Sequence, residues 1–381
     1  MQHELIILNQ LSEHYGKNKN YIIASGGNSS YKTDDDLWIT ASGSFLGNLG
    51  KDDILKLSRK KLAKLRSKEY DSDPRLREEQ IKDDLVSSMT DSVPGKRPSV
   101  ETSLHDLIEY AYIIHTHPTL VNGLLCSNHA ETMTKKLFGD LEAMYVRYYD
   151  PGYTLFRKIE EGLLQYRREQ KQDPKLIFIQ NHGIFVGSDS PDEIKELYNL
   201  VHERLENEIK IEPDLFPVSI NDKASAILPA IQAMFSDKKL TYLKLRNNAL
   251  IESFLESEQT FERISRPFTP DIIVFCKSHY LYIHEENNTV KILRAVQDGL
   301  QKFQHSYGYL PKIILVKHLG IISVDVHEKY SKIVLDIFED LIKISCYSDN
   351  FGGPHFMNDQ EILFIEEWEA EKFRHEAAEK N

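Results

Sequence analysis

The stretch Tyr112-Ile113-Ile114-His115-Thr116-His117-Pro118 places two histidines, two positions apart, at the end of an apolar segment. Apolar residues bounded by a proline predict a short strand, and side chains two apart on a strand point to the same face. His115 and His117 are therefore predicted to share a face, where two imidazoles can bind one metal ion. The pair alone is weak evidence, because a chain with 15 histidines forms such pairs by chance.

A third histidine lies in Gln180-Asn181-His182-Gly183-Ile184. Residues 175–186 are predicted as a strand interrupted at this point, where Gly183 lets the backbone bend. Three histidines with one open coordination position are typical of a catalytic zinc site. We hypothesise that His115, His117 and His182 hold Zn²⁺, with Mn²⁺, Fe²⁺ or Co²⁺ as alternatives. Taken by itself, His182 is also compatible with a polar residue in a tight turn.

The helix predicted before the histidine strand carries a candidate catalytic carboxylate. Ser99 is typical of an N-cap, and the apolar residues after it recur at helical spacing. Glu101 falls in the first turn, where it can act as a general base on a metal-polarised substrate or simply interact with the helix dipole. His105 shares its face and is interpreted as a buried structural histidine, with support of the metal site as the alternative.

Two segments rich in small polar residues, 26–30 and 40–43, offer backbone N–H groups and hydroxyls that can cradle a phosphate. Each one alone is equally typical of a hairpin turn. Residues 21–24 and 37–40 beside them are predicted as short strands joined by an acidic turn. Residues 51–97 are highly charged and predict one polar helix followed by a long loop.

Length and composition indicate a globular protein of two domains. The chain of 381 residues is longer than a single hydrophobic core usually supports. Pro213 and Pro217 mark a boundary that separates domains at 1–215 and 223–381. A net charge of −12 argues against nucleic-acid binding. The three cysteines form no CxxC pair, no apolar run suits a bilayer, and the N-terminus has no signal-peptide pattern. We therefore expect a cytoplasmic protein that binds no membrane.

The second half contains an internal repeat of the first. Residues 174–184, with the sequence PKLIFIQNHGI, resemble residues 311–321, with the sequence PKIILVKHLGI, without a gap. We infer a diverged copy of one fold, with two unrelated strand–turn–helix units as the alternative. Leu319 stands where His182 stands in the first half, so the copy is expected to lack a metal. Strands are predicted at 271–283 and 311–324, and helices at 223–235, 328–343 and 360–378.

Five motifs, in order, resemble the class II aldolase/adducin family over roughly residues 5–210. They are Gly27-Asn28-Ser29-Ser30, Thr40-Ala41-Ser42-Gly43, Arg97-Pro98-Ser99-Val100-Glu101-Thr102, His115-Thr116-His117-Pro118 and Asn181-His182-Gly183. Within the family, the resemblance is greatest to the aldolase part of rhamnulose-1-phosphate aldolase/alcohol dehydrogenases. We find no GxGxxG and expect no dehydrogenase domain. The resemblance implies an α/β fold with a mixed or antiparallel sheet flanked by helices, followed by a second, degenerate aldolase-like or accessory domain.

The resemblance also implies roles for single residues. His115, His117 and His182 match the metal ligands, and Glu101 matches the catalytic carboxylate. The positions that hold substrate phosphate in the family match Gly27, Asn28, Ser42, Gly43 and Ser99. Val100 departs from the serine often found there, which leaves the substrate open. Tyr148 and Tyr149 are only loose matches to a proton-donating tyrosine.

The expected function is that of a metal-dependent aldolase. Such a lyase cleaves a ketose 1-phosphate, similar to rhamnulose 1-phosphate, to dihydroxyacetone phosphate and an aldehyde through a metal-stabilised enediolate. Epimerisation, dehydration or decarboxylation of a sugar phosphate on the same site are alternatives, as is a non-catalytic, adducin-like scaffold. Retention of all three histidines and Glu101 favours an enzyme. Family resemblance further implies a homo-oligomer, either a dimer or a tetramer.

Overall fold

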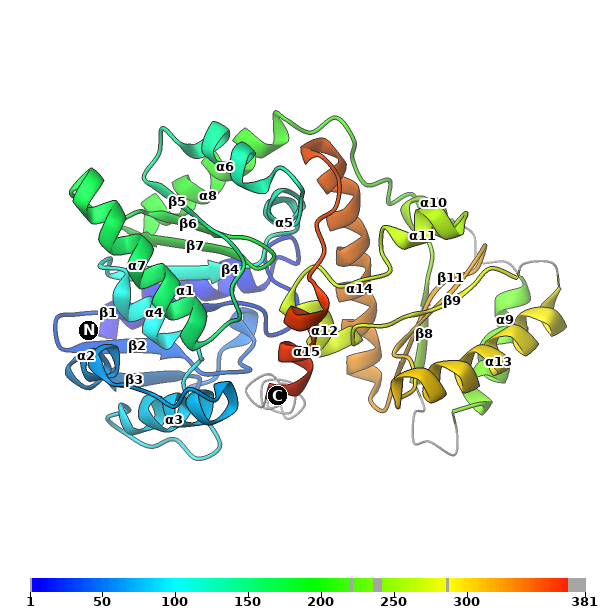
Figure 1. The fold of residues 1–381 in the computed structure, drawn as a ribbon, viewed down its shortest axis with the longest axis horizontal. Coiled ribbons are helices and arrows are strands. Elements are labelled where there is room, and N and C mark those ends of the chain that lie inside the picture. The colour runs from blue at the N-terminus through cyan, green and yellow to red at the C-terminus, as the bar shows by residue number, and fades with distance from the viewer. Residues whose placement is uncertain (1, 219–221, 236–241, 286–287, 369–381) are drawn as a thin grey trace. The chain divides into compact units, whose positions relative to one another are not determined.

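Seven strands form one sheet in the order β3-β2-β1-β4-β7-β6-β5 (Figure 1). Neighbouring strands are antiparallel except β5 and β6, which run parallel. The prediction of a mixed or antiparallel sheet flanked by helices is confirmed, and the sheet is mixed. The strands are β1 (Asn28–Lys32), β2 (Asp36–Thr40), β3 (Ile54–Ser58), β4 (Tyr112–Thr116), β5 (Ala143–Val146), β6 (Leu176–Ile179) and β7 (Gly183–Ser188).

The computed structural model describes residues 2–218, 222–235, 242–285 and 288–368. Its described part divides into two units, one built mainly from residues 2–125 and 129–209, the other from residues 126–128 and 210–366. Among the described residues, no helix is both long and apolar enough to cross a membrane.

Helices cover both faces of the seven-stranded sheet. On one face, Leu104 of α4 and Ile159 of α7 pack with Ile113 of β4. On the other face α1 meets α8, since the rings of Tyr15 and Tyr198 lie 4.4 Å apart. The helices of this unit are α1 (Gln2–Gly16), α2 (Arg59–Ser67), α3 (Pro74–Ser87), α4 (Thr102–Leu107), α5 (Thr119–Leu125), α6 (Ala130–Phe138), α7 (Tyr153–Gln170) and α8 (Pro191–Glu206), with the 3-10 turn η1 (Leu46–Asn48).

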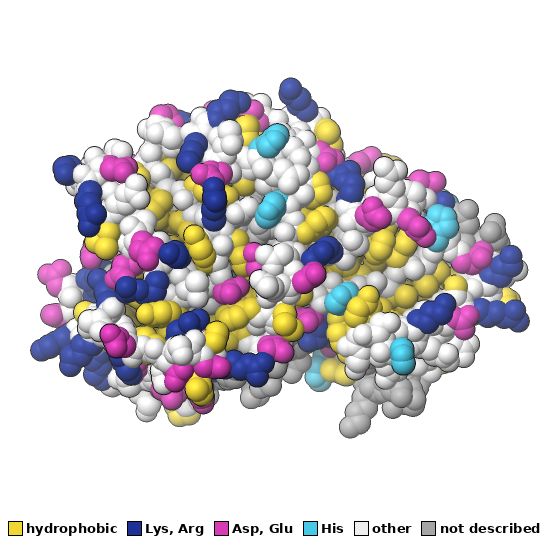
Figure 2. Space-filling view, viewed as in Figure 1, with side chains coloured by type: hydrophobic (Ala, Val, Ile, Leu, Met, Phe, Trp, Pro, Cys, Tyr) yellow, Lys and Arg dark blue, Asp and Glu magenta, His cyan; other side chains and the backbone are white. Residues whose placement is uncertain are grey.

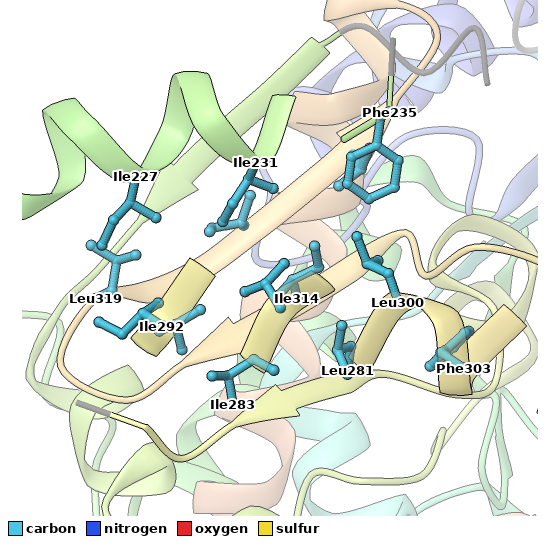
Figure 3. Close-up of a cluster of buried hydrophobic side chains, with 14 of the residues drawn as sticks. Ile227, Ile231, Phe235, Leu281, Ile283, Ile292, Leu300, Phe303, Ile314 and Leu319 are labelled. Carbon is cyan, nitrogen blue, oxygen red and sulfur yellow. The ribbon is translucent and has the colours of Figure 1, made fainter. Parts of the chain in front are cut away.

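The second unit has a four-stranded sheet in the order β8-β11-β10-β9. Figure 3 shows its core, where side chains of α9 and α13 cover one face of the sheet. The strands are β8 (Tyr242–Arg246), β9 (Leu281–Ile283), β10 (Ile313–Val316) and β11 (Gly320–Asp325). The remaining helices are α9 (Asp222–Ala233), α10 (Ala249–Leu255), α11 (Glu258–Glu262), α12 (Pro270–Cys276), α13 (Thr289–Tyr307), α14 (Glu328–Ser348), η3 (Asp349–Phe351) and α15 (Asp359–Glu367).

The small sheet repeats half of the large one. The order β8-β11-β10-β9 has the same strand directions as β4-β7-β6-β5, including the single parallel pair. A left-handed residue lies in the turn between β6 and β7 and in the equivalent turn between β10 and β11. These residues are Asn181 with φ 52° and His318 with φ 57°. α7 and α13 also both end on a left-handed residue, Lys171 and Gly308. Equivalent turns therefore fall at the positions that the sequence repeat aligns.

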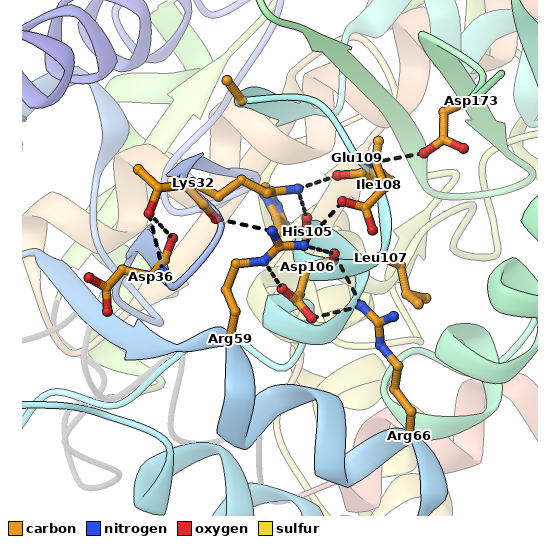
Figure 4. A network of polar contacts seen from close by, with 12 residues as sticks. Lys32, Asp36, Arg59, Arg66, His105, Asp106, Leu107, Ile108, Glu109 and Asp173 are labelled. Carbon is orange, nitrogen blue, oxygen red and sulfur yellow. Dashed lines mark hydrogen bonds and ion pairs between the residues drawn. The ribbon is translucent and has the colours of Figure 1, made fainter.

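Buried charge fixes α4 against the sheet (Figure 4). Lys32 of β1 is buried, and its side-chain nitrogen donates to the carbonyls of His105 and Ile108 at the end of α4. Burial lowers the pKa of Lys32 to about 7. Arg59 of α2 adds a 2.6 Å ion pair to the nearly buried Asp106. The short α4, which begins directly after Glu101, is thereby held in place from β1 and α2.

Several predicted elements differ from the structure. Residues 21–24, predicted as a strand, form turns in which Tyr21 and Ile22 donate to the Asn18 carbonyl, and the strand begins at Asn28 instead. Residues 51–97 contain β3, α2 and α3 rather than one helix. Residues 271–276, predicted as the first part of a strand at 271–283, lie instead in α12, since Pro270 starts a helix well and most of the helix is buried. In the helix predicted at 360–378, α15 ends at Glu367, and residues 369–378 lie outside the described residues.

Gly27 provides a test of the packing between β1 and β4. Its φ is 90°, and a Cβ there would lie 2.4 Å from the His115 carbonyl oxygen. Gly95 has a similar φ of 75° with nothing within 4 Å. We expect Gly27→Ala to lower the free energy of unfolding by roughly 2–5 kcal/mol and Gly95→Ala by about 1–2 kcal/mol. Urea unfolding followed by circular dichroism measures both, and equal losses would contradict the close approach.

Glu78 provides a test of buried charge. Burial raises its pKa from 4.5 to about 7, while its Oε1 accepts a hydrogen bond from the Tyr153 N–H at the start of α7. A raised pKa in the folded state contributes stability that is present below pH 4.5 and is lost as the pH rises through about 7. Glu78→Gln keeps an acceptor and removes the charge. We expect the unfolding midpoint of this variant minus that of wild type to be larger at pH 8 than at pH 5. An equal difference at the two pH values would contradict the raised pKa of Glu78.

Candidate metal centre

The three predicted metal ligands lie together at one end of the large sheet. His115 is the fourth residue of β4, His117 follows the end of that strand, and His182 lies in the turn between β6 and β7. One ring nitrogen from each falls within a group that spans 4.8 Å. The Nε2 atom of His115 lies 2.9 Å from that of His117 and 3.3 Å from that of His182. His115 and His182 are buried and His117 is half-buried.

The chain reaches this arrangement because two strand ends meet there. β4 pairs with β7 so that His115 faces Phe185, and their rings stack at 3.9 Å. Asn181 adopts a left-handed conformation in the tight turn. A Cβ on Gly183 would lie 2.4 Å from the Thr116 carbonyl oxygen, so only glycine lets the turn approach β4 this closely. The turn thus brings His182 to the end of β4.

The tautomer of His115 suits a metal ligand. Its Nδ1 lies 3.0 Å from the Ile184 carbonyl oxygen, which can only accept. Nδ1 therefore carries the proton in the neutral ring, and the lone pair of Nε2 points into the cluster. Nearby, the buried Asn122 donates from Nδ2 to the His182 carbonyl at 3.3 Å and supports the turn. Nothing in the sequence pattern singled out Asn122, because its contact depends on two segments far apart in the chain.

Glu101 lies beside the three histidines. Its Oε1 lies 3.5 Å from His115 Nε2 and 3.3 Å from His182 Nε2. This oxygen is buried and accepts no hydrogen bond, whereas Oε2 accepts one from Asn28 Nδ2 at 2.6 Å. Three imidazole nitrogens beside an unsatisfied carboxylate oxygen match the ligand types that Zn²⁺ and similar ions prefer. The residues present therefore fit a divalent transition metal.

The five predicted phosphate-binding residues lie on three neighbouring segments of the same unit. Asn28 Nδ2 lies 3.4 Å from Ser99 Oγ, Ala41 forms a β-bridge with Pro98, and the Ser42 N–H donates to the Arg97 carbonyl. Segments 27–28, 41–43 and 97–99 are therefore adjacent. The other two predicted phosphate-binding residues, Gly27 and Gly43, have left-handed φ values of 90° and 81°.

Asp53 fixes the loop that follows Ser42. It accepts hydrogen bonds from the Lys96 side chain at 2.7 Å, the Gly50 N–H at 2.7 Å and the Ser44 hydroxyl at 2.9 Å. Burial opposes ionisation, but these three donors outweigh it and lower the pKa of Asp53. The carboxylate of Asp53 therefore fixes the loop through these hydrogen bonds and forms an ion pair with Lys96.

The two loosely matched tyrosines lie at the end of β5. The Tyr148 N–H donates a hydrogen bond of 3.3 Å to Oε1 of Gln180, which lies two residues before His182 in the chain. Tyr149 packs against the core between α4 and α7. On the face shown in Figure 2, basic side chains gather at the lower left, over α2, whose sequence is RKKLAKLRS, and elsewhere acidic and basic side chains are interspersed.

A sequence model of the family described as Class II Aldolase and Adducin N-terminal domain matches residues 10–209, just over half of the chain. The protein therefore belongs to the class II aldolase and adducin family. Its curated relatives include the Bacillus subtilis (strain 168) protein named "Uncharacterized oxidoreductase YuxG", which is 22% identical over 390 residues, 92% of this chain and 55% of that protein. The chain thus spans about half the length of this relative.

A second curated relative is the L-fuculose phosphate aldolase of Methanocaldococcus jannaschii, 29% identical over 176 residues, which cover 44% of this chain and 74% of that protein. Among solved structures, the N-terminal class II aldolase domain of a conserved Thermoplasma acidophilum protein is 23% identical, with a TM-score of 0.44. That match covers 52% of this chain and 91% of the other.

Metal content tests the centre directly. Among the described residues, the three-histidine cluster is the one group of its kind. We expect about one divalent ion per wild-type chain after purification or Zn²⁺ addition, and its loss in His117→Ala, because two imidazoles hold an ion far less tightly than three. The exposed His305 gives a matched control, and His305→Ala should keep the ion. A wild-type protein that binds no ion after Zn²⁺ addition would refute the metal centre.

Proposed function

We propose that this protein is a metal-dependent lyase that cleaves a ketose 1-phosphate, similar to rhamnulose 1-phosphate, to dihydroxyacetone phosphate and an aldehyde. The observation that carries the proposal is the buried Glu101 Oε1, which lies beside the three histidines without a hydrogen bond. A carboxylate held in this way is available to a substrate atom. Family membership supports chemistry on a sugar phosphate.

In the proposed reaction, the chain's own residues position the substrate and move one proton. His115, His117 and His182 would hold a divalent ion, Zn²⁺ by preference, which as a Lewis acid stabilises the negative charge that develops on oxygen as the C–C bond breaks. Glu101 takes up the proton released by the hydroxyl group that becomes the aldehyde and delivers it to the carbon that becomes nucleophilic; in the condensing direction the proton moves the opposite way.

The phosphate group is proposed to bind where the three small-residue segments meet. Gly27, Asn28, Ser42, Gly43 and Ser99 form this group of residues, as the family resemblance implies. The Asn28 amide already contacts Glu101, so we expect the hydroxyls of Ser42 and Ser99 and the backbone at the two glycines to make most contacts. A phosphate held there would contact Ser99, which lies two residues before Glu101 in the chain.

We further propose that residues 1–215 form the catalytic domain and that residues 223–381 form a degenerate, accessory copy. The strand registers align His115 with Leu245, His117 with Asn247 and His182 with Leu319. None of the three aligned residues is a histidine, so the copy offers no equivalent ligand set at this position. We expect one metal site per chain, in a cytoplasmic homo-oligomer.

Epimerisation, dehydration or decarboxylation of a sugar phosphate remain alternatives on the same site, because they also use a metal-stabilised negative charge. These reactions differ from aldol cleavage in the acid and base groups around the ion. A non-catalytic, adducin-like scaffold is the alternative of a different class. Such a scaffold has no use for an unsatisfied buried carboxylate next to three histidines, and this favours the enzyme.

Release of dihydroxyacetone phosphate tests the proposal. Metal-loaded protein is incubated with L-rhamnulose 1-phosphate or L-fuculose 1-phosphate, and the product is detected by its NADH-dependent reduction. We expect turnover by the wild type and a loss of about 100-fold or more in kcat for Glu101→Gln, which keeps the size of the side chain but removes the base.

The control is Glu203→Gln, on the exposed face of α8, which should keep full activity. Metal content of the Glu101→Gln protein should equal that of wild type. Absence of dihydroxyacetone phosphate from both substrates with metal-loaded wild type would refute this aldolase assignment.

A further inference from the structure

Behind Glu101 lies a buried chain of hydrogen bonds that runs from the carboxylate through Asn28 to His105. Asn28 Nδ2 lies 2.6 Å from Glu101 Oε2, and Asn28 Oδ1 contacts His105 Nε2. On the far side of the ring, His105 Nδ1 lies 2.7 Å from the hydroxyl of Ser30. All four residues are buried, and His105 and Ser30 have no exposed surface.

The direction of every bond in this chain follows from the donors and acceptors available. An ionised carboxylate only accepts, so the Asn28 NH₂ group must face Glu101. Its carbonyl oxygen then faces His105, and since that oxygen also only accepts, Nε2 must carry a proton. Burial lowers the pKa of His105 well below its usual range, with smaller contributions from His115 and Lys32. The ring is therefore neutral, Nδ1 is bare, and the Ser30 hydroxyl donates to it.

The local structure fixes both ends of this chain. Asn28 and Ser30 are on β1, where Asn28 pairs with His115 in the register between β1 and β4. His105 is on α4, and its backbone carbonyl accepts from the buried Lys32 of β1. Phe185 contacts the His105 ring edge-on at 5.4 Å and stacks on the His115 ring. The ring of His105 can therefore neither rotate nor leave its place without moving residues of the metal centre.

We infer that His105, as the neutral Nε2–H tautomer, is a positioning residue that orients Asn28 and thereby turns the free oxygen of Glu101 toward the three histidines. If the ring were absent, the Asn28 amide could rotate and present its carbonyl oxygen to Glu101. Two acceptors would then face each other, and the carboxylate would be displaced from its present position. The role in the reaction rests on the proposed function, but the tautomer does not.

The first measurement determines the tautomer in the wild-type protein. Histidine labelled with ¹⁵N and ¹³C is incorporated, and correlation spectra report which ring nitrogen of each histidine carries the proton. The His105 signal is identified by its absence from the His105→Gln spectrum. We expect a neutral ring protonated at Nε2, whose Nε2–H resonance shifts in Asn28→Ala because its acceptor is lost. A ring protonated at Nδ1, or an Nε2–H that does not respond to Asn28→Ala, would overturn the inference.

The second measurement compares His105→Gln with His105→Asn, which remove the same ring. A glutamine amide nitrogen can reach the place of Nε2 and still donate to Asn28, whereas the shorter asparagine reaches only the place of Nδ1. We expect kcat for cleavage of the ketose 1-phosphate to fall by about 10- to 100-fold in His105→Asn, with KM and metal content nearly unchanged. His105→Gln should recover most of this loss. Equal losses in the two variants would overturn the positioning role.

The two measurements separate this inference from the proposed function. If the metal-loaded wild type releases no dihydroxyacetone phosphate, the aldolase proposal fails, and the tautomer with its response to Asn28→Ala alone decides the assignment of His105. If the wild type is active but both variants lose activity together with thermal stability and metal, His105 is only a core residue, and the inference is wrong.

Discussion

The pairing of β1 with β4 is the constraint on which the rest of the site depends. Gly27 approaches the His115 carbonyl so closely that any side chain would separate the two strands. The resulting register sets Asn28 opposite His115. Because Asn28 also contacts Glu101, the carboxylate before α4 and the histidines after it are positioned by the same strand. A displacement of β1 would therefore disturb the carboxylate, its supporting amide and the segments predicted to bind phosphate at once.

Stability and chemistry are separable in this fold, as its two units illustrate. Both contain the same hairpin with a left-handed residue in the turn and a parallel strand beside it. In the first unit the turn carries His182, and in the second the aligned Leu319 is part of a hydrophobic core. The hairpin is thus sustained by its backbone geometry and apolar packing. The three histidines that are candidate metal ligands occur in the first unit, and the residues aligned with them in the second are Leu245, Asn247 and Leu319.

Local sequence patterns predicted the strands that are marked by apolar runs and bounded by turn residues. The strand that begins at Tyr112 and the break at Asn181-His182-Gly183 lie where the pattern placed them. Patterns failed where packing overrides local preference. Residues 272–276 are apolar and by local pattern favour a strand, yet they lie in α12, a helix most of whose residues are buried. The segment from Asn28 reads as a loop because of its small polar residues, yet it is a central strand whose polar side chains serve the site.

The sequence by itself determined the identity of the candidate ligands, the order of the family motifs and the internal repeat, because each depends on residue type and spacing alone. Only the tertiary structure decided that one oxygen of Glu101 stays free, that Asn28 supports the other, and that His105 stands behind them. These contacts join β1 to α4 across more than 70 positions of sequence. No local pattern encodes them, since hydrogen-bond partners are selected by the strand register and by burial, which exist only after the chain has folded.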